Sequence, residues 1–147
     1  MIVSGFEFYE TMAGSFRLRG EARDRPMSFT VRARSPRWRS FLAQPVVEIE
    51  GEIDAEGFAD HRHARGTLGL DPIRTRTLPY AFRFIGNDGA SYAFAGKKDI
   101  YLARIVESMT VLPGAILDAA GAPVGEALLR FDLRSDLSRF LRSFKLA

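Results

Sequence analysis

The chain has 147 residues, 46% hydrophobic and 27% charged, with a net charge of +3. This size and composition are typical of one soluble globular domain, which we expect to span residues 1–147. The lack of cysteine excludes disulfides and thiolate chemistry. The N-terminal residues do not resemble a signal peptide, and no apolar run is long enough for a membrane-spanning helix, so we expect a cytoplasmic protein.

The first expected strand covers residues 5–18 and carries a charge on its buried face. Strand residues alternate between the two faces, so every second side chain points the same way. The residues of one face are Phe6, Phe8, Glu10 and Met12. Three of these are large and apolar, which predicts that the Glu10 carboxylate also points into the core. The Ala13-Gly14 pair predicts a bend or bulge in this strand.

The remaining segments predict more strands joined by short turns, and two helices. Ser35-Pro36 favours a short helix, with Ser as the N-cap and Pro at the first helical position, and Pro45 ends it. Asn87-Asp88-Gly89 predicts a tight hairpin, because Asp-Gly supplies the positive φ that such turns need. Further strands are expected at 27–34, 46–53, 58–70, 80–85, 91–100, 107–117 and 124–133, and a C-terminal helix at about 135–145.

This order of elements predicts an all-β fold. About eight mostly antiparallel strands in sequential hairpins favour an up-and-down, calycin-like barrel with a short helix after the second strand and a helix at the C-terminus. A two-sheet sandwich is the alternative. Many basic residues lie two apart and interleave with apolar ones, as on the solvated side of a strand with one buried face. We therefore expect no nucleic-acid binding.

A second out-of-place charge lies in the segment YAFAGKKDIY. Here the in-phase residues are Tyr92, Phe94, Gly96, Lys98 and Ile100. An ionised carboxylate is costly to bury alone, so Lys98 is the natural counterpart of Glu10. Two interpretations stay open. The pair is either an internal salt bridge or the polar spot of a ligand cavity. Gly96 would allow another backbone or a ligand to approach closely.

Other chemistry has weaker support in the sequence. His61 and His63 lie two apart, but spacing places no carboxylate or cysteine beside them, so we expect no metal site. No nucleophile elbow and no glycine-rich phosphate loop is present, so we predict no catalytic residues and no cofactor. Glu10 with Tyr9, Tyr80, Tyr92 or Tyr101 could run acid–base chemistry, but every barrel interior contains such residues. A membrane surface is not the expected partner of the basic C-terminal segment.

Several short motifs resemble a β-barrel module that accompanies glucose–methanol–choline-type, cholesterol oxidase-like flavin oxidoreductases. In order over roughly residues 6–112, they are Phe8-x-Glu10-x-Met12-x-Gly14, Pro26-Met27-x-Phe29, the strand with Gly66, and aromatic-x-Phe94-x-Gly96-x-Lys98. The segments LDPIRTRTLPY and RIVESMTV depart from the module. The resemblance implies a barrel associated with lipid or sterol metabolism and no established activity of its own.

We therefore expect non-enzymatic binding of a hydrophobic small molecule, lipid- or sterol-like, inside the barrel. The expected ligand-binding residues are Phe6, Phe8, Glu10, Met12, Tyr92, Phe94 and Lys98. Possible protein partners are a flavin oxidoreductase or a second copy of the chain. The alternatives are an interaction module with a solid core, and an isomerase or cyclase acting inside the barrel.

Overall fold

The computed structural model describes residues 5–101, 108, 110–131 and 145–146. In this part of the chain the main strands alternate inward apolar and outward polar residues, which is why they curl around one core. The elements are β1 Phe6–Leu18, β2 Arg25–Arg34, α1 Trp38–Ala43, β3 Val46–Ala55, β4 Ala59–Gly69, α2 Pro72–Thr75, β5 Thr77–Ile85, β6 Ser91–Asp99, β7 Val111–Leu117, β8 Pro123–Arg130 and β9 Lys145–Leu146.

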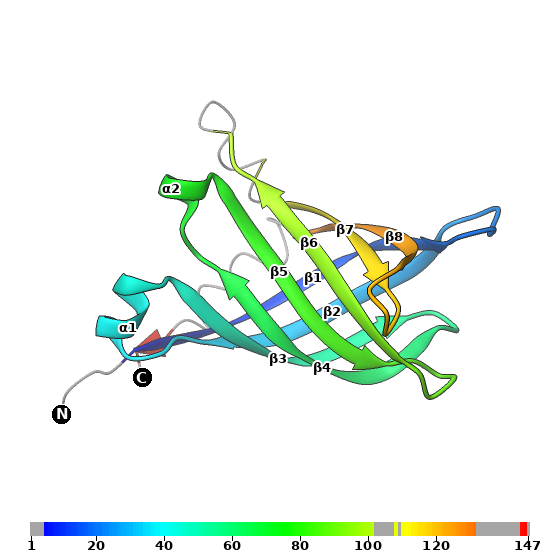
Figure 1. Cartoon of the computed structure of the whole chain (residues 1–147), viewed down its shortest axis with the longest axis horizontal. Helices are drawn as coiled ribbons and strands as arrows, with labels where there is room; N and C mark the ends of the chain where they lie inside the picture. The colour runs from blue at the N-terminus through cyan, green and yellow to red at the C-terminus, as the bar shows by residue number, and fades with distance from the viewer. Residues whose placement is uncertain (1–4, 102–107, 109, 132–144, 147) are drawn as a thin grey trace.

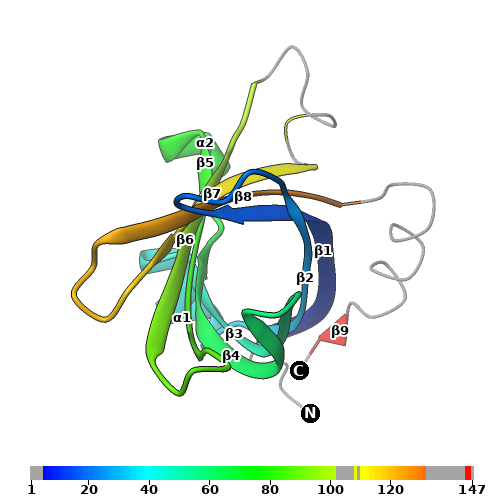
Figure 2. The same ribbon diagram turned by 90° about the vertical axis from the view of Figure 1, so that its right-hand side faces the viewer.

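The strands form a closed antiparallel barrel (Figures 1 and 2). Each strand from β1 to β8 pairs with the next, and β8 pairs with β1, so eight strands complete the circle. The two-residue β9 adds to the free edge at the start of β1. The predicted all-β, up-and-down antiparallel barrel is therefore confirmed, and the two-sheet sandwich is not what the chain forms.

The two ends of the barrel differ in their connections. The turns after β1, β3, β5 and β7 lie at one end, which we call the turn end. The β2–β3 and β4–β5 connections, with α1 and α2, lie at the opposite end, which we call the helix end (Figure 1). The predicted hairpin about Asn87-Asp88-Gly89 is confirmed, because β5 and β6 pair on either side of it.

The short helix after the second strand is confirmed, but its predicted cap is wrong. Helix α1 begins at Trp38, and its N-cap is Arg37, with no side-chain cap. The Ser35 hydroxyl instead accepts a hydrogen bond from the backbone N–H of Phe6 at 2.8 Å. The Ser35 side chain thus fastens the end of β2 to the start of β1. The segment after residue 70 contains the second short helix, α2.

The predicted C-terminal helix falls mostly outside the described residues. At its expected end, Lys145–Leu146 form β9 and pair with Phe6 and Glu7 of β1.

β1 runs through Ala13-Gly14 in unbroken register with β2, so the structure has no bulge there, and Gly14 has a packing role instead. A Cβ at this position would collide with the backbone carbonyl of Leu128 on β8. Gly14 pairs with Leu129 of β8, and the missing side chain leaves room for a close approach of the two backbones. This close approach lets the last strand join the first and close the barrel.

The outer surface agrees with the expected solvated face. Arg32 on β2 lies opposite Glu50 on β3, and Glu50 lies opposite Arg65 on β4. Charges of alternating sign on neighbouring strands stabilise a sheet surface modestly. Arg32 therefore has an acidic cross-strand neighbour, whereas Arg65 lies between Glu50 of β3 and Arg83 of β5.

Candidate functional site

Three polar side chains meet inside the barrel. Glu10 comes from β1, Tyr80 from β5 and Lys98 from β6. In the order of strands around the barrel, β5 lies diametrically opposite β1. Each of the three side chains occupies an inward-facing position of its strand, so the group spans the interior from wall to wall. We call this group the Glu10 cluster.

The cluster is buried, and its hydrogen bonds converge on a single atom. The exposed fractions of Glu10, Tyr80 and Lys98 are 9%, 2% and 4%. The Tyr80 hydroxyl donates a short hydrogen bond to Oε1 of Glu10. The Lys98 ammonium lies 3.5 Å from the same oxygen, and its Nζ is 5.1 Å from the centre of the Tyr80 ring. The predicted pairing of Glu10 with Lys98 is confirmed.

Tyr80 acts in this cluster as a neutral donor. Burial raises the pKa of its phenol well above the usual value of 10.0, and the nearby Glu10 charge and the hydrogen bond to it raise the pKa further. The phenol therefore keeps its proton throughout the physiological range. The phenol donates a hydrogen bond to the buried Glu10 carboxylate without adding a second charge to the interior.

The cluster has hydrogen-bonding capacity that the described residues do not use. An ammonium group has three N–H donors, and Lys98 directs one weak contact at Glu10. Oε2 of Glu10 has no hydrogen-bond partner among the described residues. Among the described residues, Nε of Arg25 is the only polar side-chain atom that is fully buried and has no hydrogen-bond partner. Oε2 of Glu10 is therefore not fully buried, and a molecule the size of water can reach it.

The helix end of the barrel is lined by Phe6 and Phe8, which are 7% and 5% exposed. The Phe6 ring contacts two rings of α1, with centroid distances of 5.4 Å to Trp38 and 5.2 Å to Phe41. Helix α1 therefore packs over the helix end through aromatic contacts. Phe6 and Phe8 are the apolar residues of the predicted site that lie between the Glu10 cluster and the surface.

The protein's own aromatic rings extend from the Glu10 cluster toward the turn end, beginning with Phe29, which lies 6.0 Å from the Tyr80 ring. Phe82 and Phe94 stack at 4.9 Å, and Phe29 lies 5.1 Å from Phe82 and 6.1 Å from Phe94. Tyr92 stacks at 6.0 Å on Phe84, and its hydroxyl donates to Asp88 at 2.6 Å. Of the predicted ligand contacts, Phe94 and Tyr92 are thus engaged in aromatic packing away from the helix end.

Met12 and Gly96 have surroundings that bear on the predicted site. Met12 is fully buried in the core. A Cβ on Gly96 would lie 2.6 Å from the carbonyl oxygen of Pro113 on β7 and 3.0 Å from the Phe94 ring. Of the two interpretations of Gly96, the approach of another backbone is the one that the structure supports.

The two histidines lie on the exposed face of β4. Contrary to the expectation from spacing, carboxylates of β3 lie beside them: His61 is 3.2 Å from Asp54, and His63 is 3.1 Å from Glu50. The strand register, which the sequence does not reveal, brings these groups together. The described residues still contain no group of three or more metal ligands.

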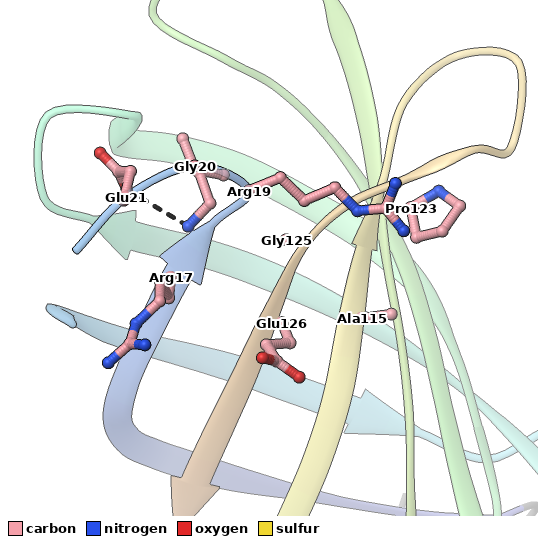
Figure 3. Close-up of a pocket in the computed structure, with 9 residues that line it drawn as sticks. Arg17, Arg19, Gly20, Glu21, Ala115, Pro123, Gly125 and Glu126 are labelled. Carbon is pink, nitrogen blue, oxygen red and sulfur yellow. Dashed lines mark hydrogen bonds between the residues drawn. The ribbon is translucent and has the colours of Figure 1, made fainter. Parts of the chain in front are cut away.

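A charged hollow of about 440 Å³ lies on the surface between the ends of β1 and β8 (Figure 3). Its lining includes Arg17, Arg19 and Glu126. The Arg17 guanidinium is bound to Asp24 at 2.9 Å. The hollow is open and contains no buried polar group, so we assign it no binding role.

No protein-family model, curated protein or solved structure matches this chain. Within the described residues, no helix has the length and apolar character needed to cross a membrane. The function must therefore be argued from the Glu10 cluster and the two ends of the barrel.

Proposed function

We propose that this barrel binds a hydrophobic small molecule, lipid- or sterol-like, which enters at the helix end. Glu10 and Lys98 orient the polar end of the ligand, and Phe6 and Phe8 contact its apolar body. The observation that carries the proposal is a buried ion pair with unused donors and an unused acceptor in an otherwise apolar interior. A mostly apolar site with a few convergent polar groups is typical of small-molecule binding.

A buried ion pair such as Glu10–Lys98 need not add to the stability of the fold. Removing two charges from water is expensive, and apolar replacements of similar volume are often neutral or stabilising. The contact between Lys98 and Glu10 is also long, at 3.5 Å, and does not use the full donor capacity of the ammonium. A ligand that hydrogen-bonds to both groups would account for their retention. Eight-stranded barrels have an interior wide enough for one small ligand.

We also propose that the barrel is calycin-like and that it acts together with a protein partner. The resemblance of the β1 and β6 motifs to the module of cholesterol oxidase-like flavin oxidoreductases supports a role accessory to such an enzyme. In that role the barrel would hold or deliver an apolar molecule, and the chemistry would belong to the partner.

The proposal is tested by titration with N-phenyl-1-naphthylamine, a neutral apolar probe whose emission rises in apolar surroundings. We expect saturable binding with one site per chain. Trp38 is the single tryptophan and contacts Phe6 at the helix end, so its emission should change in parallel. A Trp38→Phe variant should keep the probe signal and lose the tryptophan signal. The absence of saturable binding by the native protein would contradict the proposal.

A second function is favoured by the exposed apolar side chains of α1. Leu42 is 71% exposed and Trp38 is 37% exposed. These residues suit an interaction module that docks a partner or a second copy at the helix end. In that case the probe should not bind, and the mass measured by light scattering should rise with protein concentration and return to the monomer value in Leu42→Ser.

A further inference from the structure

The open atoms of the Glu10 cluster define the kind of polar group that fits there. Oε1 of Glu10 already accepts from Tyr80 and faces Lys98. Two features have no partner among the described residues: Oε2 of Glu10, which accepts hydrogen bonds, and the remaining N–H groups of Lys98, which donate them. A group bound between them must donate to one side and accept from the other.

The charges of the Glu10 cluster further limit which polar group of a ligand can bind there. Glu10 and Lys98 carry opposite charges and balance each other, and the Tyr80 phenol is neutral. A ligand carboxylate would place a second anion beside Glu10, and a ligand ammonium would place a second cation beside Lys98. Each would leave a net charge in a buried site, which is strongly unfavourable. A ketone would accept from Lys98 but leave Oε2 without a donor.

We infer that the ligand's polar end is an uncharged hydroxyl group, so that the barrel selects long-chain or polycyclic alcohols over the corresponding acids, amines and hydrocarbons. The hydroxyl donates to Oε2 of Glu10 and accepts from Nζ of Lys98. This inference rests on the proposed function, because it concerns the same site.

The test measures displacement of bound N-phenyl-1-naphthylamine by dodecan-1-ol, dodecanoate, dodecylamine and dodecane. These compounds share one chain and differ at its end. Dodecan-1-ol should compete about tenfold better than dodecane, because one net hydrogen bond contributes roughly that factor in affinity. Dodecanoate and dodecylamine should compete no better than dodecane.

Charge-changing variants test the assignment to these two residues. Glu10→Gln leaves the cluster positive and should shift the preference toward dodecanoate. Lys98→Met leaves it negative and should shift the preference toward dodecylamine. The double variant Glu10→Gln/Lys98→Met restores neutrality and should lose the preference for the alcohol. Probe binding and thermal unfolding of each variant show whether it is folded. If a single variant does not fold, the assignment is tested with the double variant alone.

The outcomes separate the inference from the proposed function. Binding of the probe with dodecanoate, dodecylamine or dodecane competing as well as the alcohol overturns the inference and leaves the proposed function standing. If none of the four compounds displaces the probe, the inference is also overturned, because the probe then occupies another site. Failure of the native protein to bind the probe overturns both.

Discussion

Tyr80 links the charged pair to the opposite wall of the barrel. Its hydroxyl is the strongest hydrogen-bond donor that the described residues supply to Glu10, and its ring lies beneath the Lys98 ammonium. The hydrogen bond to Glu10 requires a neutral phenol, because only the protonated hydroxyl can donate. Burial disfavours the phenolate, and a phenolate would also place a second anion against Glu10, so the pKa of Tyr80 is raised.

The raised pKa predicts that stability falls at high pH. Above about pH 10 an unfolded tyrosine loses its proton while folded Tyr80 keeps it, so the stabilisation is complete below this pH and is lost as the pH rises. The free energy of unfolding, measured by urea denaturation, should fall more steeply between about pH 10 and 11 in the native chain than in Tyr80→Phe. The difference is at most about 1.4 kcal/mol per pH unit.

Tyr101→Phe is the matched control, because the Tyr101 side chain is 63% exposed. It should keep the steep slope of the native chain. Equal slopes for the native chain and Tyr80→Phe would contradict the neutral-donor role.

At this scale the sequence predicted the charged pair, but it offered Tyr80 only as one of four tyrosines that could act with Glu10. Strict alternation placed Glu10 and Lys98 on buried faces, and opposite charge made them partners. Tyr80 is in phase with Phe82 and Phe84 on an apolar face, so it resembled one more core aromatic. Its role depends on which strand lies across the barrel from β1, and alternation along one strand does not contain that information.

At the scale of elements, the closure of the barrel depends on the contact between β1 and β8. Gly14, within β1, leaves room for the Leu128 backbone, and the Ser35 hydroxyl accepts a hydrogen bond from the Phe6 N–H at the start of β1. β1 is thus held by one contact that needs a residue without a side chain and one that needs a hydroxyl.

Gly14→Ala should therefore destabilise the fold. The added methyl would overlap the Leu128 carbonyl, and overpacking of this kind typically costs about 1–3 kcal/mol. The measurement is the free energy of unfolding, with the neighbouring Ser15→Ala as a control that should lie within about 0.5 kcal/mol of the native chain. An unchanged stability for Gly14→Ala would show that β1 and β8 can separate at no cost.

The elements were mostly predictable because their patterns are local. Inward apolar residues at alternate positions identified β1 to β3, and turn residues identified the β5–β6 hairpin. The N-cap at Ser35 failed for a non-local reason: the Phe6 N–H, 29 residues away, uses the hydroxyl that would have capped the helix. The cross-strand carboxylates of His61 and His63 were missed because the register between β3 and β4 was unknown.

At the scale of the whole molecule, the two halves of the barrel have different contents. The rings of Phe29, Phe82 and Phe94 pack against one another in the middle of the barrel, and Phe29 also contacts Tyr80 of the Glu10 cluster, while Phe6, Phe8 and α1 lie on the helix-end side of that cluster. The sequence indicated which residues face inward, but not which of them meet across the interior. It assigned Phe94 and Tyr92 to the same ligand site as Glu10; the structure shows both rings in aromatic contacts, and their part in a ligand site stays a prediction.

The central claim, that the helix end of the barrel holds an apolar ligand, is tested most directly by native mass spectrometry of the purified chain. The account predicts an added mass of one small molecule per chain that disappears on denaturation and is recovered in organic extracts. The double variant Glu10→Gln/Lys98→Met should carry less of it. A native chain that shows only its own mass, both as purified and after incubation with long-chain alcohols, would contradict the claim.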